Sequence, residues 1–167
     1  GVSEGDELVV RGLIVRAVRA VHGGKRMPWN DAAETLGYIV AGTQSFYFAG
    51  DTDIYDEMAH LHIELDLALL PVWGWGSSLG VGHLDPERAA AAVKLIRPRV
   101  AVPIHWGGYL PYTLEQRHPH LLVEPPRIFR RLVEGLDIGT RVELIEPGAA
   151  ANVAPVSPGE RDSRRQG

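Results

Sequence analysis

His22, Asp51 and His105 can each bind a metal or transfer a proton, and each follows a short run that predicts a buried strand. If these runs are buried strands of one sheet, their carboxyl ends lie at the edge where ligands of α/β proteins collect. Two imidazoles and a carboxylate form a donor set suited to zinc, manganese or iron. We therefore expect a divalent-metal site at this edge, most naturally for zinc. The three runs are Val15–Val21, Phe46–Ala49 and Val100–Ile104.

Each of these residues also has a purely structural interpretation. Asp51 and Thr52 could cap the helix predicted to begin at Ile54, a common role for Asp and Thr. His105 could be a core histidine bonded to a backbone carbonyl. The sequence holds no local metal-binding spacing, because the three positions lie far apart along the chain. Their shared place after predicted strands favours a site and leaves the alternatives open.

Composition excludes several classes of site and partner. The chain has no cysteine, so disulfides and thiolate metal sites are excluded. The net charge is −4 and the 17 lysines and arginines are scattered, which argues against a nucleic-acid partner. No apolar run approaches the roughly 20 residues of a membrane-spanning helix, and no signal peptide is visible. We therefore expect a cytoplasmic protein without an integral membrane segment.

The elements that must position these residues follow an α/β order. Two β-hairpins come first, and strands then alternate with helices, which indicates a layered α/β domain over residues 1–146. Asp85 and Pro86 supply a helix N-cap and first helical residue. The composition after Pro147 predicts a disordered tail over 147–167. The expected strands are Glu7–Val10, Leu13–Val21, Leu36–Val40, Ser45–Phe48, Asp66–Val72, Val100–Ile104 and Arg141–Ile145, and the expected helices are Ile54–His62, Pro86–Ile96 and Pro126–Leu136.

Four sequence motifs occur in a characteristic order. The strand ending Ala20-Val21-His22 is followed by the basic residues Lys25-Arg26. Phe-Ala-Gly-Asp-Thr spans 48–52, Gly-His-Leu-Asp-Pro-Glu-Arg-Ala spans 82–89, and Pro-Ile-His-Trp-Gly spans 103–107. In this order, over roughly residues 6 to 146, they resemble the metallo-β-lactamase superfamily. The likeness is closest to the ascorbate-lactonase-like and N-acylphosphatidylethanolamine phospholipase D-like branch.

The resemblance implies both a fold and a chemistry. The fold is a four-layer αββα sandwich with mixed β-sheets flanked by helices, of which this chain supplies the C-terminal portion. His22 would bind a first metal, Asp51 would bridge two metals, and His105 would bind the second. A metal-bound hydroxide would attack an ester, lactone or phosphodiester of a small-molecule substrate.

Three further residues are candidates for substrate contact. The resemblance places His83 near the substrate, where it would stabilise an oxyanion or protonate a leaving group. Alternatively, His83 only flanks the N-terminus of the helix that begins at Asp85, and both roles stay open. Arg26 would bind an anionic group of the substrate, with a solvated loop as the alternative. Trp106 and the other loop tryptophans suggest an apolar pocket wall.

The chain departs from the family pattern in one respect. The His-x-His-x-Asp-His motif, which supplies four of the seven metal ligands, is absent. We expect the first third of the parent protein to be missing, and the chain alone to be inactive. The alternative is a non-catalytic binding or assembly module that keeps the fold and a partial metal site. If the upstream part is absent, one apolar sheet face lacks its partner layer, so we expect a homo-oligomer that covers it.

Overall fold

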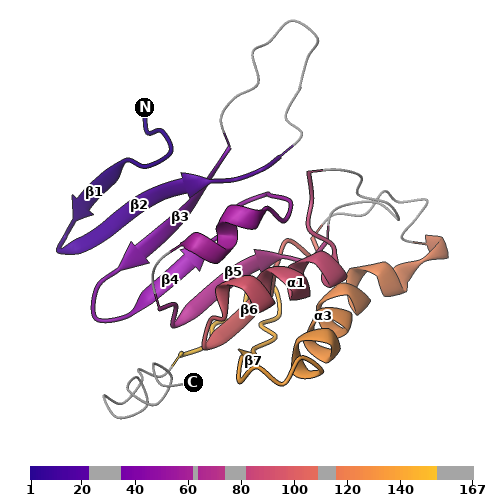
Figure 1. Cartoon of the computed structure of the whole chain (residues 1–167). Coiled ribbons are helices and arrows are strands. Elements are labelled where there is room, and N and C mark those ends of the chain that lie inside the picture. Colours follow the sequence, from indigo (N-terminus) through magenta and orange to yellow (C-terminus); the bar gives the residue numbers. More distant parts are fainter. Residues whose placement is uncertain (23–34, 62–63, 74–81, 109–115, 154–167) are drawn as a thin grey trace, which may run out of the picture.

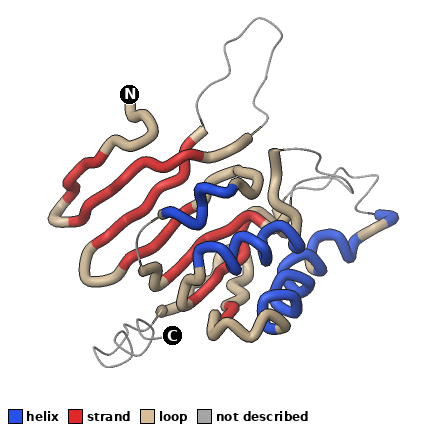
Figure 2. Tube along the Cα trace, in the orientation of Figure 1, coloured by secondary structure: helices blue, strands red, loops and turns tan. Residues whose placement is uncertain are grey.

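A computed structural model describes residues 1–22, 35–61, 64–73, 82–108 and 116–153. Within these residues, seven strands form one sheet in sequence order, and helices lie against it (Figures 1 and 2). The strands are β1 (Glu7–Val10), β2 (Leu13–Arg19), β3 (Leu36–Ala41), β4 (Ser45–Phe48), β5 (Leu67–Pro71), β6 (Val100–Ile104) and β7 (Arg141–Val142). The helices are η1 (Asp56–His60), α1 (Pro86–Ile96), η2 (Pro119–Leu122) and α3 (Glu124–Glu134).

The first four strands form antiparallel hairpins, as the sequence predicts. Arg11 and Gly12 close the first hairpin with φ angles of 50° and 83°. Two successive positive φ angles match the right-handed twist of the flanking strands, which explains the two-residue loop. The second hairpin joins β3 to β4 around Gly42 and Thr43.

From β4 onward the strands are parallel, with α1 between β5 and β6 and α3 between β6 and β7. Because β2 and β4 are both antiparallel to β3, they run in the same direction as β5 and β6. The carboxyl ends of β2, β4, β5 and β6 therefore share one edge of the sheet. This arrangement confirms the predicted α/β class with a mixed sheet.

The core lies between one face of the sheet and the helices. Tyr47 and Ala68, which are register partners on β4 and β5, point into it and are fully buried. Ala89 and Val93 of α1 and Phe129 of α3 meet them in the same buried cluster. The alanines on the buried side of α1 belong to this cluster, and α1 also packs against α3 and η1.

The helix α1 begins and ends as its sequence predicts. The Asp85 carboxylate accepts the backbone N–H of Arg88 at 2.8 Å, and Pro86 occupies the first turn. Arg97 ends the helix in the left-handed conformation, one residue before Pro98.

The opposite sheet face is apolar and more open. Leu8, Val10 and Leu13 at its outer end are 50%, 50% and 44% exposed, and Phe48 of β4 is 40% exposed. The central strands contribute half-buried side chains to this face, so β5 is not buried on both faces as predicted. The described residues therefore form one sheet and one helical layer of the expected sandwich. The homo-oligomer expected over this face stays a prediction. The half-buried residues are Val15, Tyr38, Val40, Phe46, Leu67 and Leu69.

Some predicted boundaries are wrong. The predicted helix Ile54–His62 is only the short 3-10 helix η1, because the Asp53 carboxylate accepts the Ile54 N–H at 2.8 Å and Tyr55 is extended. The last helix begins and ends two residues earlier than predicted, and β7 is only two residues long.

The expected tail lies mostly outside the described residues, since 154–167 are not among them. Residues 147–153 contain neither helix nor strand. Among the described helices, none combines the length and apolar character needed to cross a bilayer.

Candidate metal centre

The segments that follow β2 and β4 are tied together at the carboxyl edge of the sheet. The Val21 N–H donates to the Thr52 hydroxyl at 2.8 Å, and the Asp53 N–H donates to the Val21 carbonyl at 2.6 Å. Gly50 makes this approach sterically feasible: its φ is 67°, and a Cβ there would lie 2.9 Å from the Leu36 carbonyl oxygen. A residue with a side chain at position 50 would push this strand end away, so glycine is needed to bring Asp51 to His22.

Three side chains from three segments converge at this edge. Asp51 Oδ2 lies 3.7 Å from His22 Nδ1 and 3.8 Å from His83 Nε2. The two imidazole rings meet edge to face, with centroids 4.6 Å apart. One ligand atom from each of the three residues lies within 4.8 Å of the others. The side chains are 24% (His22), 36% (Asp51) and 27% (His83) exposed, so solvent reaches the cluster.

This cluster fits a divalent metal ion. Ligand atoms at about 2.0–2.2 Å from a shared zinc stand about 3–4 Å from one another. Asp51 Oδ2 and His83 Nε2, which are 3.8 Å apart, have this spacing. His22 Nδ1 lies 3.7 Å from Asp51 Oδ2 but also 3.0 Å from the Gly82 carbonyl oxygen, which leaves Nε2 of His22 to bind a metal. His83 Nδ1 is buried and has no hydrogen-bond partner among the described residues. A buried polar atom without a partner costs free energy, and functional sites are where such a cost is commonly found. The donor set and the spacing therefore support the metal site predicted from the sequence.

His105 stands at the carboxyl end of β6 but does not belong to this three-residue cluster. Its Nδ1 lies 2.5 Å from the Trp73 carbonyl oxygen, and its backbone has a left-handed φ of 62°. Metal-binding histidines usually fix their second ring nitrogen on such a carbonyl. A left-handed non-glycine residue is a strain that concentrates at functional sites. His105 as a ligand stays a prediction with this local support.

The structural alternatives fare differently. His105 is exposed, so it is not a core histidine, but its Nδ1 does bond a backbone carbonyl, that of Trp73, as this alternative expected. Asp51 does not cap the helix that follows, because η1 begins at Asp56 and the preceding Tyr55 makes no side-chain capping bond.

The segment that carries His83 is held against the other two ligand segments. The Leu84 N–H donates to the Thr52 carbonyl at 2.8 Å, and His22 Nδ1 lies 3.0 Å from the Gly82 carbonyl oxygen. His83 thus flanks the α1 N-terminus and also faces Asp51, and its role toward a substrate stays a prediction.

A family model described as a β-lactamase superfamily domain matches residues 1–106. The chain belongs to the β-lactamase superfamily. The UPF0173 metal-dependent hydrolase of Methanopyrus kandleri is a relative with 33% identity over 150 residues, which cover 86% of this chain and 58% of that protein. The predicted superfamily is confirmed, and the narrower branch stays a prediction.

Solved structures of this superfamily show the same architecture. Igni18, a metallo hydrolase from the archaeon Ignicoccus hospitalis, matches with a TM-score of 0.68 and 27% identity over 90% of this chain and 59% of its own. The metallo-β-lactamase fold protein YhfI of Bacillus subtilis matches with a TM-score of 0.60 and 14% identity over 86% of this chain and 51% of its own, which shows the fold alone. This chain spans less than two thirds of each of these proteins and of the Methanopyrus relative.

The predicted substrate-binding residues have different outcomes in this superfamily member. Trp106 is half-buried, packs against the core and donates its indole N–H to the Pro103 carbonyl at 3.0 Å. Its role in substrate binding stays a prediction. Arg26 lies outside the described residues, as do Trp29 and Trp75.

Sequence reasoning missed two charged residues beside the site. Asp53 and Arg88 form an ion pair with an N–O distance of 3.2 Å. The sequence gives little indication of this pair, because 35 residues separate its members. Each also stands near a predicted helix start, where charged residues are common.

Proposed function

We propose that the protein is a metal-dependent hydrolase that cleaves an ester, a lactone or a phosphodiester of a small-molecule substrate. One observation carries this proposal: His22, Asp51 and His83 converge from three chain segments to within 4.8 Å at the carboxyl edge of the sheet. The relatives named above as metal-dependent or metallo hydrolases support the same class of reaction.

The proposed ligands are His22 and Asp51, together with His105 from the end of β6. Zinc is the proposed metal, with manganese and iron as alternatives, because imidazole and carboxylate donors suit all three. When bound, such a metal lowers the pKa of a water molecule and polarises a substrate oxygen. The chain's part is to hold the Asp51 carboxylate and the His22 ring at one point, through the Thr52 and Val21 hydrogen bonds.

The distance from Asp51 would also suit His83 Nε2 as a metal ligand. We assign His83 instead to stabilise the substrate oxygen that gains negative charge. A neutral imidazole carries one N–H. Since Nδ1 is buried and has no partner among the described residues, a proton there would lack an acceptor, which favours the proton at Nε2. Nε2 is also the atom that faces Asp51 at 3.8 Å. An N–H donor fixed at the reaction centre stabilises a developing oxyanion.

The test compares His22→Ala with His83→Ala. Each purified protein is loaded with zinc, manganese or iron(II), and its metal content is measured by elemental analysis. Hydrolysis of an aryl ester, a lactone and an aryl phosphodiester is then followed. We expect His22→Ala to lose the metal, and His83→Ala to keep it while turnover falls by about 10²–10³-fold.

Three outcomes would contradict parts of this proposal. Wild-type protein without any bound metal would overturn the metal-dependent function. Loss of metal in His83→Ala would make His83 a ligand instead of an oxyanion donor. Metal binding without hydrolysis of any of the substrates would favour a non-catalytic binding module.

A further inference from the structure

Arg88 connects Asp53 to the backbone of His83. Its Nη1 lies 3.2 Å from both carboxylate oxygens of Asp53 and 3.3 Å from the His83 carbonyl oxygen. The Asp53 side chain is 11% exposed and that of Arg88 is 41% exposed. A single guanidinium nitrogen therefore joins the segment after β4 to the residue that faces Asp51.

The Asp53 carboxylate also binds the backbone beside His83 directly. Its Oδ2 accepts the Gly82 N–H at 2.9 Å, while its Oδ1 accepts the Ile54 N–H at 2.8 Å. On the other side of His83, the Leu84 N–H donates to the Thr52 carbonyl at 2.8 Å. The backbone is thus anchored before, at and after the histidine.

Arg88 is itself held by the first turn of α1. Its backbone N–H donates to Asp85 Oδ1 at 2.8 Å, and its Nε lies 3.9 Å from Asp85 Oδ2. The helix α1 is fixed by its contacts with α3 and by the buried core. The guanidinium therefore links His83 to α1, a helix that the core holds in place.

We propose that Asp53 and Arg88 are positioning residues that hold His83 at the carboxylate of Asp51. The consequence for catalysis rests on the proposed function, whereas the positioning itself does not. A nearly buried carboxylate that loses its cationic partner is unfavourable, so without Arg88 the Gly82 and His83 bonds loosen together. A catalytic group that is displaced by about 1 Å can cost up to about 10²-fold in turnover.

The experiment measures amide hydrogen exchange in metal-free, full-chain protein. Arg88→Met removes the charge, and Arg88→Lys keeps it. Asp53→Asn removes the carboxylate charge at equal size and serves if Arg88→Met fails to fold. The matched control is Arg141→Met, which breaks the exposed Arg141–Glu143 pair at the start of β7.

We expect exchange at Gly82, whose N–H binds the Asp53 carboxylate, to accelerate by at least about tenfold in Arg88→Met and Asp53→Asn, the size expected for loss of a hydrogen bond to a charged group. Exchange at Leu84, whose N–H binds the Thr52 carbonyl, accelerates with it as the segment loosens. Arg88→Lys restores part of the protection, and Arg141→Met leaves it unchanged. Exchange at Val21, whose N–H binds Thr52, stays slow in all variants. In the zinc-loaded protein, turnover falls by up to about 10²-fold in Arg88→Met and recovers in part in Arg88→Lys. Zinc affinity measured by calorimetry stays unchanged in both variants, because His83 is not a proposed ligand.

Unchanged exchange at Gly82 and Leu84 in a folded Arg88→Met protein would overturn the positioning role. The same acceleration in Arg141→Met would also overturn it, because the effect would then be global. If wild-type protein binds none of zinc, manganese and iron(II), the proposed function is wrong, while the exchange result still decides whether the pair positions His83.

Discussion

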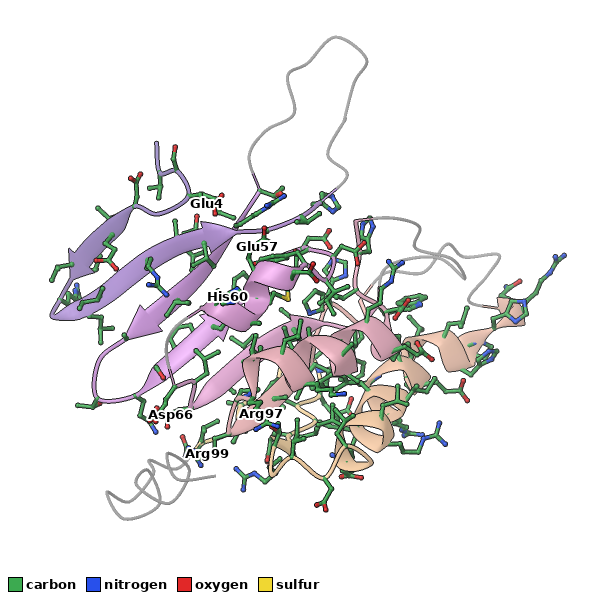
Figure 3. The ribbon with its side chains drawn as sticks, viewed as in Figure 1. Glu4, Glu57, His60, Asp66, Arg97 and Arg99 are labelled. Atoms are coloured by element: carbon green, nitrogen blue, oxygen red, sulfur yellow. The ribbon has the colours of Figure 1, made fainter. Side chains whose placement is uncertain are left out.

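Each end of the parallel strands carries an aspartate near a basic or imidazole group, but the two aspartates differ in burial and in hydrogen bonding. At the amino-terminal end, the Asp66 carboxylate accepts the Ser45 N–H at 2.9 Å and lies 3.7 Å from Arg99 Nε. Its side chain is only 11% exposed, and Figure 3 shows it beside Arg99 at one end of the sheet. At the carboxyl end, Asp51 is 36% exposed, and its nearest cationic or imidazole contacts are 3.7–3.8 Å away.

The difference distinguishes a cluster that stabilises the fold from the cluster that we propose as the metal site. A buried carboxylate with short hydrogen bonds contributes to stability and leaves nothing for a ligand to satisfy. An open carboxylate between two imidazoles, one with a buried nitrogen that no described residue partners, has capacity for a cation. Residue types alone do not distinguish these ends, because each has an aspartate close to a basic or imidazole group.

Asp66→Ala should produce the largest loss of stability. It removes the acceptor of the Ser45 N–H and the partner of Arg99, so we expect the free energy of unfolding to fall by about 3 kcal/mol. Asp51→Ala in metal-free protein should change it by no more than about 0.5 kcal/mol, since this side chain lacks short bonds. Urea unfolding of both variants measures the contrast. Equal losses would show that the Asp51 end is also structural.

Metal addition should stabilise the protein only through the carboxyl end of the strands, where Asp51 lies. At a free zinc concentration 100 times the dissociation constant, the free energy of unfolding should rise by about 2.7 kcal/mol. Asp66→Ala should keep this increment, whereas Asp51→Ala should lose it. The measurement is urea unfolding after chelator treatment, with and without zinc. An increment that survives in Asp51→Ala would place the metal elsewhere.

The same contrast explains how far the sequence could predict the molecule. Alternating apolar runs and the Arg11-Gly12 turn define the hairpins, and Asp85-Pro86 defines the start of α1, because these signals are local. The convergence of His22 and Asp51 follows from strand direction. His83 joins His22 and Asp51 within 4.8 Å, whereas His105 does not belong to this cluster. This arrangement depends on bonds from Thr52 and Asp53 to residues some 30 positions away. Such bonds are set by tertiary packing and leave no periodic pattern.

The smallest predicted effect concerns Tyr47, which lies on β4 between the two ends. Burial raises the pKa of the Tyr47 hydroxyl, and the neighbouring Tyr55 raises it further. The unfolded chain ionises this group near pH 10, whereas the folded chain keeps it protonated. Its contribution to stability is therefore complete below about pH 10 and declines above it, by up to about 1.4 kcal/mol per pH unit.

Tyr47→Phe should remove this part of the alkaline decline. We expect unfolding free energies measured in urea between pH 9 and 11 to fall less steeply than in wild type, by about 1 kcal/mol at pH 11. The matched control is Tyr38→Phe, which removes a half-buried hydroxyl on the opposite sheet face. An identical decline in Tyr47→Phe and wild type would mean that alkaline sensitivity arises outside the core of β4. If the unfolding free energy falls less steeply in Tyr47→Phe alone, the alkaline sensitivity arises from the buried part of β4 between the two polar ends, because neither end is altered in that variant.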